Sequence, residues 1–174
     1  NQSACMACPG GLYSTVLGSA TVSSCKVCTP GSSCTGGQRQ PCAKGSYSNV
    51  EKLLTCKVCL DGQYQSTTGQ TGCDACPTGT YLPPSSIPAK HESVTQCLPC
   101  PAGRYGQSSS SAACSQCVRG KWSAKVGAKD ENTCRLCPPN TISKTLGATN
   151  VTLCKACDPG FHASTNRADC LSNG

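Results

Sequence analysis

The feature that most constrains this chain is a pair of cysteines separated by two residues, which occurs eight times in 174 residues. The pairs are Cys5 and Cys8, Cys25 and Cys28, Cys56 and Cys59, Cys73 and Cys76, Cys97 and Cys100, Cys114 and Cys117, Cys134 and Cys137, and Cys154 and Cys157. Three more cysteines, Cys34, Cys42 and Cys170, lie outside this pattern. A motif that returns at short, similar intervals indicates tandem copies of one small module.

A glycine and an aromatic residue follow most of these pairs at fixed distances. The glycine lies three residues and the ring five residues after the second cysteine, in Gly11 and Tyr13, Gly62 and Tyr64, Gly79 and Tyr81, Gly103 and Tyr105, and Gly120 and Trp122. Gly45 and Tyr47 follow Cys42 at the same distances, in a variant unit where Arg39 replaces the first cysteine. One module has Asn140 and Ile142 instead, and the last has Gly160 followed by Phe161 and His162. Asparagine best replaces glycine at a positive φ, so this position predicts a left-handed turn.

The composition excludes a conventional hydrophobic core. Aromatic residues make up 4% of the chain, with one Trp, one Phe and one Met, whereas 19 residues are cysteine. That cysteine content lies above the roughly 8–10% that marks disulfide scaffolds, which form in oxidising compartments. The chain is therefore expected to be extracellular, secreted or at the cell surface. No apolar run of 18 residues is present, so no membrane insertion is expected within this segment.

The most economical disulfide scheme joins the second cysteine of each pair to the first cysteine of the next pair. It predicts Cys8–Cys25, Cys28–Cys34, Cys42–Cys56, Cys59–Cys73, Cys76–Cys97, Cys100–Cys114, Cys117–Cys134, Cys137–Cys154 and Cys157–Cys170. Cys5 is then left for a cysteine upstream of Asn1. An interleaved scheme, which joins first to first and second to second cysteines of adjacent modules, remains open because spacing does not decide between them.

Disulfides alone do not order loops of this length. A bridge that closes about 15 residues contributes about 3 kcal/mol, and ordering the same loop costs about 1–2 kcal/mol per residue. We therefore expect each ring to be buried against its bridge and the next module. The stability of each module should depend on its neighbours, as in other one-dimensional arrays.

The chain is expected to be one continuous array of nine modules and an excerpt of a longer protein. Their approximate bounds are 5–27, 28–41, 42–58, 59–75, 76–99, 100–116, 117–136, 137–156 and 157–174. Glycine-containing loops between Tyr-Ser and Thr/Val segments favour short hairpins, and helical periodicity is absent. The expected fold class is small and disulfide-rich: an elongated tandem array of short irregular β-hairpin modules with almost no helix.

Two phrases of the sequence resemble the ephrin-receptor-like cysteine-rich repeat. They are Cys-Pro-Ala-Gly-Arg-Tyr-Gly from Cys100, followed by Cys-Ser-Gln-Cys, and Cys-Pro-Thr-Gly-Thr-Tyr from Cys76, followed by Cys-Leu-Pro-Cys. That family is related to tumour-necrosis-factor-receptor and growth-factor-receptor cysteine-rich modules. The resemblance covers nearly the whole chain and implies rod-forming, disulfide-bonded β modules without catalytic residues. It implies no ligand-binding positions, because the repeat is used in receptors, surface antigens and extracellular fibres.

Other chemistries fit the residues less well. Tandem zinc ribbons also use Cys-x-x-Cys pairs, but they would leave Cys34, Cys42 and Cys170 without a role. A thioredoxin-like pair needs a βαβ setting, and a calcium loop needs clustered acidic residues. His91 and His162 accompany no triad pattern, so we expect exposed structural roles for both. No enzyme activity, metal or cofactor is expected, apart from an N-linked glycan.

Two segments are candidate contact surfaces, a basic hairpin and a long loop. The formal charge of +7 is scattered, except that Arg119, Lys121, Lys125 and Lys129 cluster in one hairpin. This hairpin is either a solvated face or a surface for a polyanion such as an acidic glycan. Nucleic acid is not expected, because a basic helix and an aromatic stacking platform are absent.

The long loop from Cys76 to Cys97 carries three prolines in six residues, which favour an extended excursion. It is either a surface bulge or a contact loop. The serine run 108–111 is expected to form a flexible hairpin tip, with O-glycosylation as a lesser alternative. N-glycosylation is expected at the sequons that begin at Asn150 and Asn1.

These observations favour a non-enzymatic extracellular rod that acts as a spacer, an adhesive stalk or a subunit of a surface fibre. The alternative is a receptor ectodomain or surface antigen that binds a protein ligand. The least favoured hypothesis is the zinc-ribbon array. Expected partners are further copies of the chain, other extracellular proteins or glycans.

Overall fold

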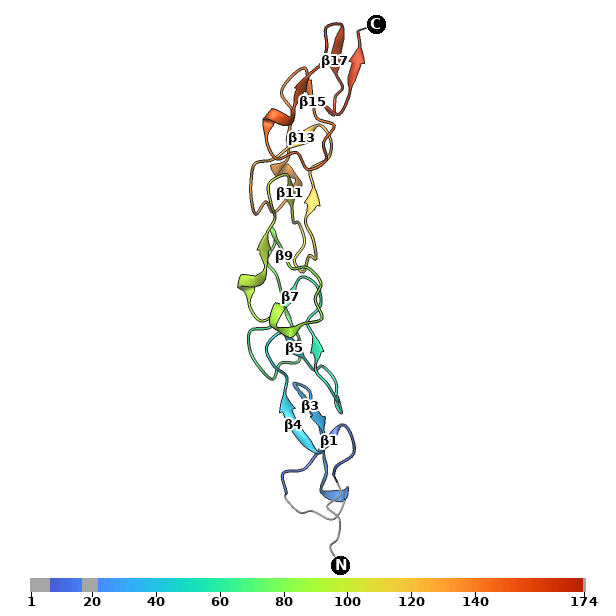
Figure 1. Ribbon diagram of the computed structural model, residues 1–174, viewed down its shortest axis with the longest axis vertical. Helices are drawn as coiled ribbons and strands as arrows, with labels where there is room; N and C mark the ends of the chain where they lie inside the picture. The colour runs from blue at the N-terminus through green and yellow to red at the C-terminus, as the bar shows by residue number, and fades with distance from the viewer. Residues whose placement is uncertain (1–6, 17–21, 174) are drawn as a thin grey trace, which may run out of the picture. The chain divides into compact units, whose positions relative to one another are not determined.

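The computed structural model describes residues 7–16 and 22–173. The chain divides into two compact units (Figure 1): unit 1 comprises Asn1–Ala75 and Pro84–Gln96, and unit 2 comprises Cys76–Pro83 and Cys97–Gly174. The module expected at 76–99 is thus divided between the two units. Within each unit, short hairpins follow one another in chain order.

The secondary structure consists of very short strands and five 3-10 turns. Unit 1 contains β1 (Leu12–Tyr13), η1 (Val22–Ser24), β2 (Lys26–Val27), β3 (Ser32–Thr35), β4 (Gln38–Pro41), β5 (Ser46–Tyr47), β6 (Lys57–Val58), β7 (Gln63–Tyr64), β8 (Asp74–Ala75), η2 (Pro88–Lys90) and η3 (Val94–Gln96). Unit 2 contains β9 (Thr80–Tyr81), β10 (Leu98–Pro99), β11 (Arg104–Tyr105), β12 (Ser115–Gln116), β13 (Lys121–Trp122), η4 (Glu131–Thr133), β14 (Arg135–Leu136), β15 (Thr141–Ile142), η5 (Val151–Leu153), β16 (Lys155–Ala156), β17 (Phe161–Ala163) and β18 (Cys170–Ser172). No α-helix occurs in the described residues, and the expected disulfide-rich hairpin modules are confirmed.

Nine two-stranded antiparallel sheets form the array. In most modules, the strand that contains the ring pairs with the two residues inside the next Cys-x-x-Cys motif. In the module 117–136, for example, Lys121 lies opposite Leu136, and Trp122 lies opposite Arg135. The variant module 28–41 differs, because β3 and β4 form a local four-residue hairpin that places Cys34 opposite Arg39. Each of the seven Cys-x-x-Cys motifs from Cys25 onward therefore serves both as a disulfide anchor and as a strand.

A tight turn precedes each ring-bearing strand. In the turn that starts at Pro101, the backbone N–H of Arg104 donates to the carbonyl oxygen of Pro101 (3.1 Å), and Gly103 lies at the third position with φ 75°. This position of a type II turn requires a positive φ. Asn140 adopts φ 56° at the same position, so the prediction of a left-handed turn is confirmed there.

Backbone hydrogen bonds connect each module to the next. The N–H of Gly103 donates to the carbonyl oxygen of Ser123 (2.7 Å), and the N–H of Gly127 donates back to the carbonyl oxygen of Cys100 (2.7 Å). The same exchange occurs in unit 1 between modules 42–58 and 59–75, where the donors are Gly45 and Gly69 (both 2.8 Å). Because only backbone groups take part, the connection tolerates wide variation of side chains.

The turn glycines also lie against the module after the next one. A Cβ added to Gly79 would lie 2.6 Å from the carbonyl oxygen of Gly127, and one added to Gly11 would lie 2.6 Å from that of Lys52. Added Cβ atoms would also overlap the second-neighbour backbone at Gly31, Gly45, Gly103 and Gly120. These positions are therefore restricted to glycine by space as well as by backbone angle.

The interior consists of disulfides and small side chains. Cys28, Cys76, Cys100 and Cys117 are fully buried, and so are Ala128 and Ala148. The rings are less buried than expected: Tyr13, Tyr47, Tyr64, Tyr81, Tyr105 and Trp122 are half-buried, and Phe161 is exposed. Successive residues of an extended segment point to opposite sides, and the residue after the ring, such as Ser48 or Ser123, is the buried one.

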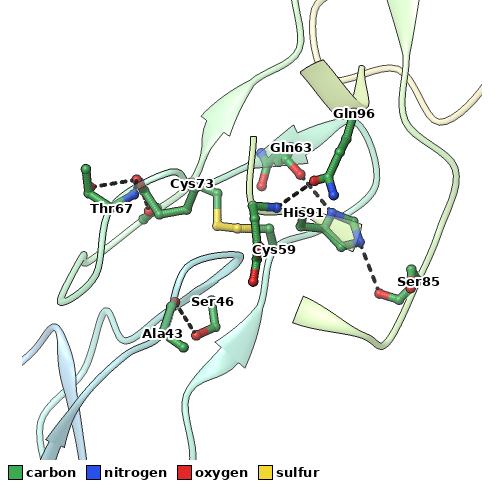
Figure 2. The surroundings of a disulfide bond; sticks show 12 residues. Ala43, Ser46, Cys59, Gln63, Thr67, Cys73, Ser85, His91 and Gln96 are labelled. Carbon is green, nitrogen blue, oxygen red and sulfur yellow. Dashed lines mark hydrogen bonds between the residues drawn. A yellow bond between two sulfur atoms is a disulfide. The ribbon is translucent and has the colours of Figure 1, made fainter. Parts of the chain in front are cut away.

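His91 is a buried residue, so the expectation of an exposed role is wrong. Figure 2 shows its ring between two carbonyl groups near the Cys59–Cys73 disulfide: Nδ1 lies 2.8 Å from the oxygen of Gln63, and Nε2 lies 3.2 Å from that of Ser85. The backbone carbonyl of His91 also accepts a hydrogen bond from the N–H of Gln65 (2.8 Å). The segment 84–96 of the long loop is thus anchored in unit 1 through His91, and most of its other residues are exposed.

Candidate functional site

The structure joins 18 cysteines in nine disulfides, in the order of the sequential scheme. They are Cys8–Cys25, Cys28–Cys34, Cys42–Cys56, Cys59–Cys73, Cys76–Cys97, Cys100–Cys114, Cys117–Cys134, Cys137–Cys154 and Cys157–Cys170. Cys5 lies outside the described residues. Sulfur atoms in disulfides are not available as zinc thiolates, so the zinc-ribbon hypothesis has no ligands from Cys8 onward.

Asn150 occupies an exposed position before η5, at the end of the 137–154 loop. Its side-chain oxygen accepts a hydrogen bond from the backbone N–H of Thr152 (2.9 Å) and contacts the Thr152 hydroxyl, the two residues that define the sequon. Asp130 caps η4 in the same way, through the N–H of Asn132 (2.9 Å). The Asn150 sequon is accessible for glycosylation, and Asn1 lies outside the described residues.

The expected basic cluster is divided between two settings. Lys121 Nζ lies 2.9 Å from Glu131 Oε1, which is the single ion pair in the described part of the chain. Lys125 instead lines an open hollow of about 320 Å³ with Trp122, Asn132, Thr133 and Arg135. Arg135 was not among the residues of the expected cluster. It reaches the hollow because the hairpin pairing places it opposite Trp122.

A second hollow lies at the equivalent place of the following module. It has a volume of about 310 Å³ and is lined by Ile142, Lys144, Thr145, Leu153 and Lys155. Each of Ile142, Thr145, Leu153 and Lys155 lies 20 residues after a lining residue of the first hollow. The two hollows are therefore repeats of one structural feature, in which a lysine from the loop and a cation from the second strand lie at the margin.

The other candidate residues have structural contacts. Ser110, in the run expected to be a flexible tip, donates its N–H to the carbonyl oxygen of Cys76 (3.3 Å), and the carbonyl of Ser111 accepts from Leu82 (3.0 Å). His162 is exposed in β17, with Nδ1 2.8 Å from Asn173 Oδ1. The serine run is thus attached to the preceding module, and His162 contacts a side chain near the end of the chain.

In residues 7–16 and 22–173, His, Cys, Asp and Glu side chains do not gather in any group of three or more that could bind a metal ion. Over the same ranges, none of the helices combines the length and the apolar character needed for a membrane crossing. The surface feature with the clearest recurring chemistry is therefore the pair of cationic hollows.

Comparison with known proteins identifies the repeat. The model of the family described as tyrosine-protein kinase ephrin type A/B receptor-like matches residues 45–86 and 89–134. A segment of 114 residues is 31% identical to the Sushi, von Willebrand factor type A, EGF and pentraxin domain-containing protein 1 of Mus musculus, and 29% identical to the protein of the same name from Rattus norvegicus. Each alignment covers 66% of this chain but only 3% of the relative. Since the family model matches half of the sequence, this chain belongs to the family of ephrin type A/B receptor-like cysteine-rich repeats.

Proposed function

We propose that this segment is a non-enzymatic, extracellular structural repeat that serves as a spacer, an adhesive stalk or part of a surface fibre. The observation that supports this most is the pattern of backbone contacts inside each compact unit. A module is hydrogen-bonded to its first neighbour and packed against its second neighbour, as Gly103 is against Ser123 and Gly147. Contacts that extend over two modules resist bending more than contacts between adjacent modules alone.

The extracellular setting of this proposal rests on the nine disulfides. Such a density of bridges forms and persists where thiols are oxidised, and the reduced interior of the cell would break them. Small modules that lack a hydrophobic core depend on these bridges for stability. A spacer outside the cell therefore needs the covalent framework that this chain has.

Small-angle X-ray scattering of the non-reduced chain tests the proposal. A compact globule of this length would have a radius of gyration of about 16 Å, and a rod should exceed this value clearly. The chain should also keep its dimensions in moderate denaturant and expand only after the disulfides are reduced. A radius near that of a globule would overturn the spacer function.

The alternative function is a receptor ectodomain, which is supported by the description of the matching family. The candidate contacts for a protein ligand are the exposed residues of the segment 84–96, such as Ile87 and Val94, and the basic hairpin with its open hollow. The complete sequence of the gene product distinguishes the two functions. A membrane-spanning segment followed by an intracellular signalling domain would favour the receptor, and many further copies of the repeat would favour the fibre.

We also propose an N-linked glycan on Asn150, supported by its exposure and by its contacts with Thr152. Mass spectrometry of a non-reduced digest should find the sugar on the peptide that contains Asn150 and should read the disulfides in the same experiment. Substitution Asn150→Gln should remove the added mass while the Cys137–Cys154 bridge persists. An unmodified Asn150 in chain secreted by eukaryotic cells would exclude the site.

A further inference from the structure

We propose that the two cationic hollows of modules 117–136 and 137–156 together bind one linear, sulfated polysaccharide. The first hollow is lined by Trp122, Lys125 and Arg135, and the second by Ile142, Lys144 and Lys155, among others. This inference goes beyond the proposed spacer function, because a spacer needs no ligand. Its test measures binding, whereas the spacer function is tested by shape, so either can fail alone.

The charge of the chain is concentrated in these two modules. Residues 117–156 contain seven basic and two acidic side chains, a formal charge of +5 out of +7 for the whole chain. One of the two acidic residues, Glu131, is already paired with Lys121. No acidic side chain lines either hollow among the described residues. The positive charge at the margins is thus available to an anion in solution.

The lining chemistry favours a sugar over a simple anion. The half-buried ring of Trp122 offers an apolar face, against which the C–H face of a sugar ring can pack. Lys125 and Arg135 can bind sulfate groups by charge-assisted hydrogen bonds, and Asn132 and Thr133 can bind hydroxyl groups. A volume of about 320 Å³ lies at the small end of the roughly 300–1,000 Å³ typical of ligand pockets.

The repetition of the hollow favours a polymer over a single sugar. Both hollows belong to unit 2, and their modules are in direct contact, because Trp122 forms a parallel bridge with Ala148 and the N–H of Ser123 donates to the same residue (3.0 Å). Ala148 lies three residues after Thr145 of the second hollow. A ligand that repeats its own charged unit can occupy both hollows, and the second contact then becomes intramolecular.

Binding can be measured directly, because Trp122 is the only tryptophan of the chain. The intact, non-reduced protein would be titrated with a heparin octasaccharide while the fluorescence of Trp122 is followed. We expect saturable quenching or a spectral shift that weakens as salt is raised from 0.05 to 0.5 M, about a threefold shorter Debye length. Neutral dextran of similar size should cause no change.

Matched variants locate the site. Lys125→Ala with Arg135→Ala should lower the affinity about tenfold, since two charge-assisted contacts are lost. Lys144→Ala with Lys155→Ala should weaken the octasaccharide several-fold but leave a disaccharide unaffected, because only the longer ligand spans two sites. The control is Lys26→Ala with Lys57→Ala, which removes the same amount of charge. Both lysines lie opposite a ring, Tyr13 and Tyr47, at the strand position that Arg135 has in its own module. The control should bind like the unmodified chain.

Three outcomes would overturn the proposal. One is an equal loss of affinity in the control variant, which would mean that net charge alone attracts the glycan. The second is heparin binding that leaves the fluorescence of Trp122 unchanged. The third is poly-glutamate of equal charge binding as tightly as the octasaccharide, which would assign the hollows to an acidic peptide. Circular dichroism of each variant must match the unmodified chain. Trp122→Phe keeps an aromatic ring and should still bind more tightly than Trp122→Ala; because neither variant contains tryptophan, isothermal titration calorimetry measures both affinities.

Discussion

The modules 117–136 and 137–156 follow the same 20-residue plan, but they differ at the turn residue. Gly120 has φ 82° and Asn140 has φ 56°, so both adopt the left-handed backbone conformation. Gly120 is buried, and a Cβ there would lie 2.6 Å from the carbonyl carbon of Arg167, two modules along. Asn140 is exposed. The turn position at Gly120 therefore imposes two constraints, a positive φ and the absence of space for a Cβ atom. Asparagine can satisfy only the first of them.

This comparison separates backbone angle from available space. A positive φ excludes most L residues by about 1–2 kcal/mol but accepts asparagine. At Gly120, the backbone of the second-neighbour module lies so close that only the hydrogen atom of a glycine fits in place of a side chain. Substitutions can test each demand alone, and the following four predictions run from the largest expected effect to the smallest.

Substitution Gly120→Asn should be the most damaging, with a loss of about 3 kcal/mol in the free energy of opening this contact. The new side chain tolerates the backbone angle, but its Cβ would overlap the carbonyl oxygen of Asn166. Hydrogen exchange would show the effect as faster exchange of the Ser143 amide, which donates to Arg167 (3.0 Å). Full protection of that amide in the variant would contradict the role of space.

Substitution Asn140→Ala should cost about 1 kcal/mol, because alanine is less tolerant of a positive φ than asparagine. The exchange rate of the Cys157 amide reports on this turn, since it donates to the carbonyl oxygen of Asn140 (3.1 Å). Asn140→Gly is the matched control and should cause no loss. If alanine and asparagine protect Cys157 equally, backbone angle is not the constraint at this turn.

Substitution Gly127→Asn should cost less than about 1 kcal/mol, although it lies in the same module as Gly120. Gly127 has φ 68°, and the nearest atom to an added Cβ is Pro99 Cβ at 3.9 Å, an ordinary contact. Lys52 and Ser110 occupy this place in other modules with φ 58° and 60°. The melting temperature of this variant should be well above that of Gly120→Asn. The reverse order would contradict the role of available space at Gly120.

Substitution Glu131→Gln should have the smallest effect, at most about 0.5 kcal/mol, because the pair with Lys121 is partly exposed to solvent, which weakens the attraction between the charges. The equivalent residues of the next module are Thr141 and Val151, which form no ion pair. Denaturant unfolding in 0.05 M and 0.5 M salt should show that even this difference disappears when charges are screened. A salt-independent loss above 1 kcal/mol would mean that the pair organises the hairpin.

Much of the local structure could be predicted from the residues alone. The fixed spacing of cysteine, glycine and ring predicts the turn, and Asn140 reveals that its backbone angle is positive. The buried positions were less predictable. Ser123 and Ala128 are buried although neither is strongly apolar, because close backbone approach between modules selects for small size. The signal in the sequence is partial: a small residue follows the ring at Ser48 and Ser123, but Gln65 and Leu82 are also buried at this position.

The candidate site was predicted only in part. The cluster of Lys125 with its neighbours is visible in the sequence, but Arg135 joins it through strand pairing across the Cys117–Cys134 loop. Residues 20 positions apart form equivalent hollows because successive modules repeat the same hairpin. His91 shows the opposite error, since a polar residue in a proline-rich loop is buried between the carbonyls of Gln63 and Ser85.

The sequence by itself determined the repeat, the family and the left-handed turns, because these depend on short-range spacing and on the backbone preferences of glycine and asparagine. Only the tertiary structure decided which modules touch, that the turn glycines lack room for a Cβ, and which cations line a common hollow. The contacts between modules join residues 17 to 48 positions apart along the chain, such as Gly79 with Gly127 or Gly120 with Ser143, and the hollow depends on strand pairing that brings Arg135 opposite Trp122. Such contacts leave no regular pattern in the local sequence.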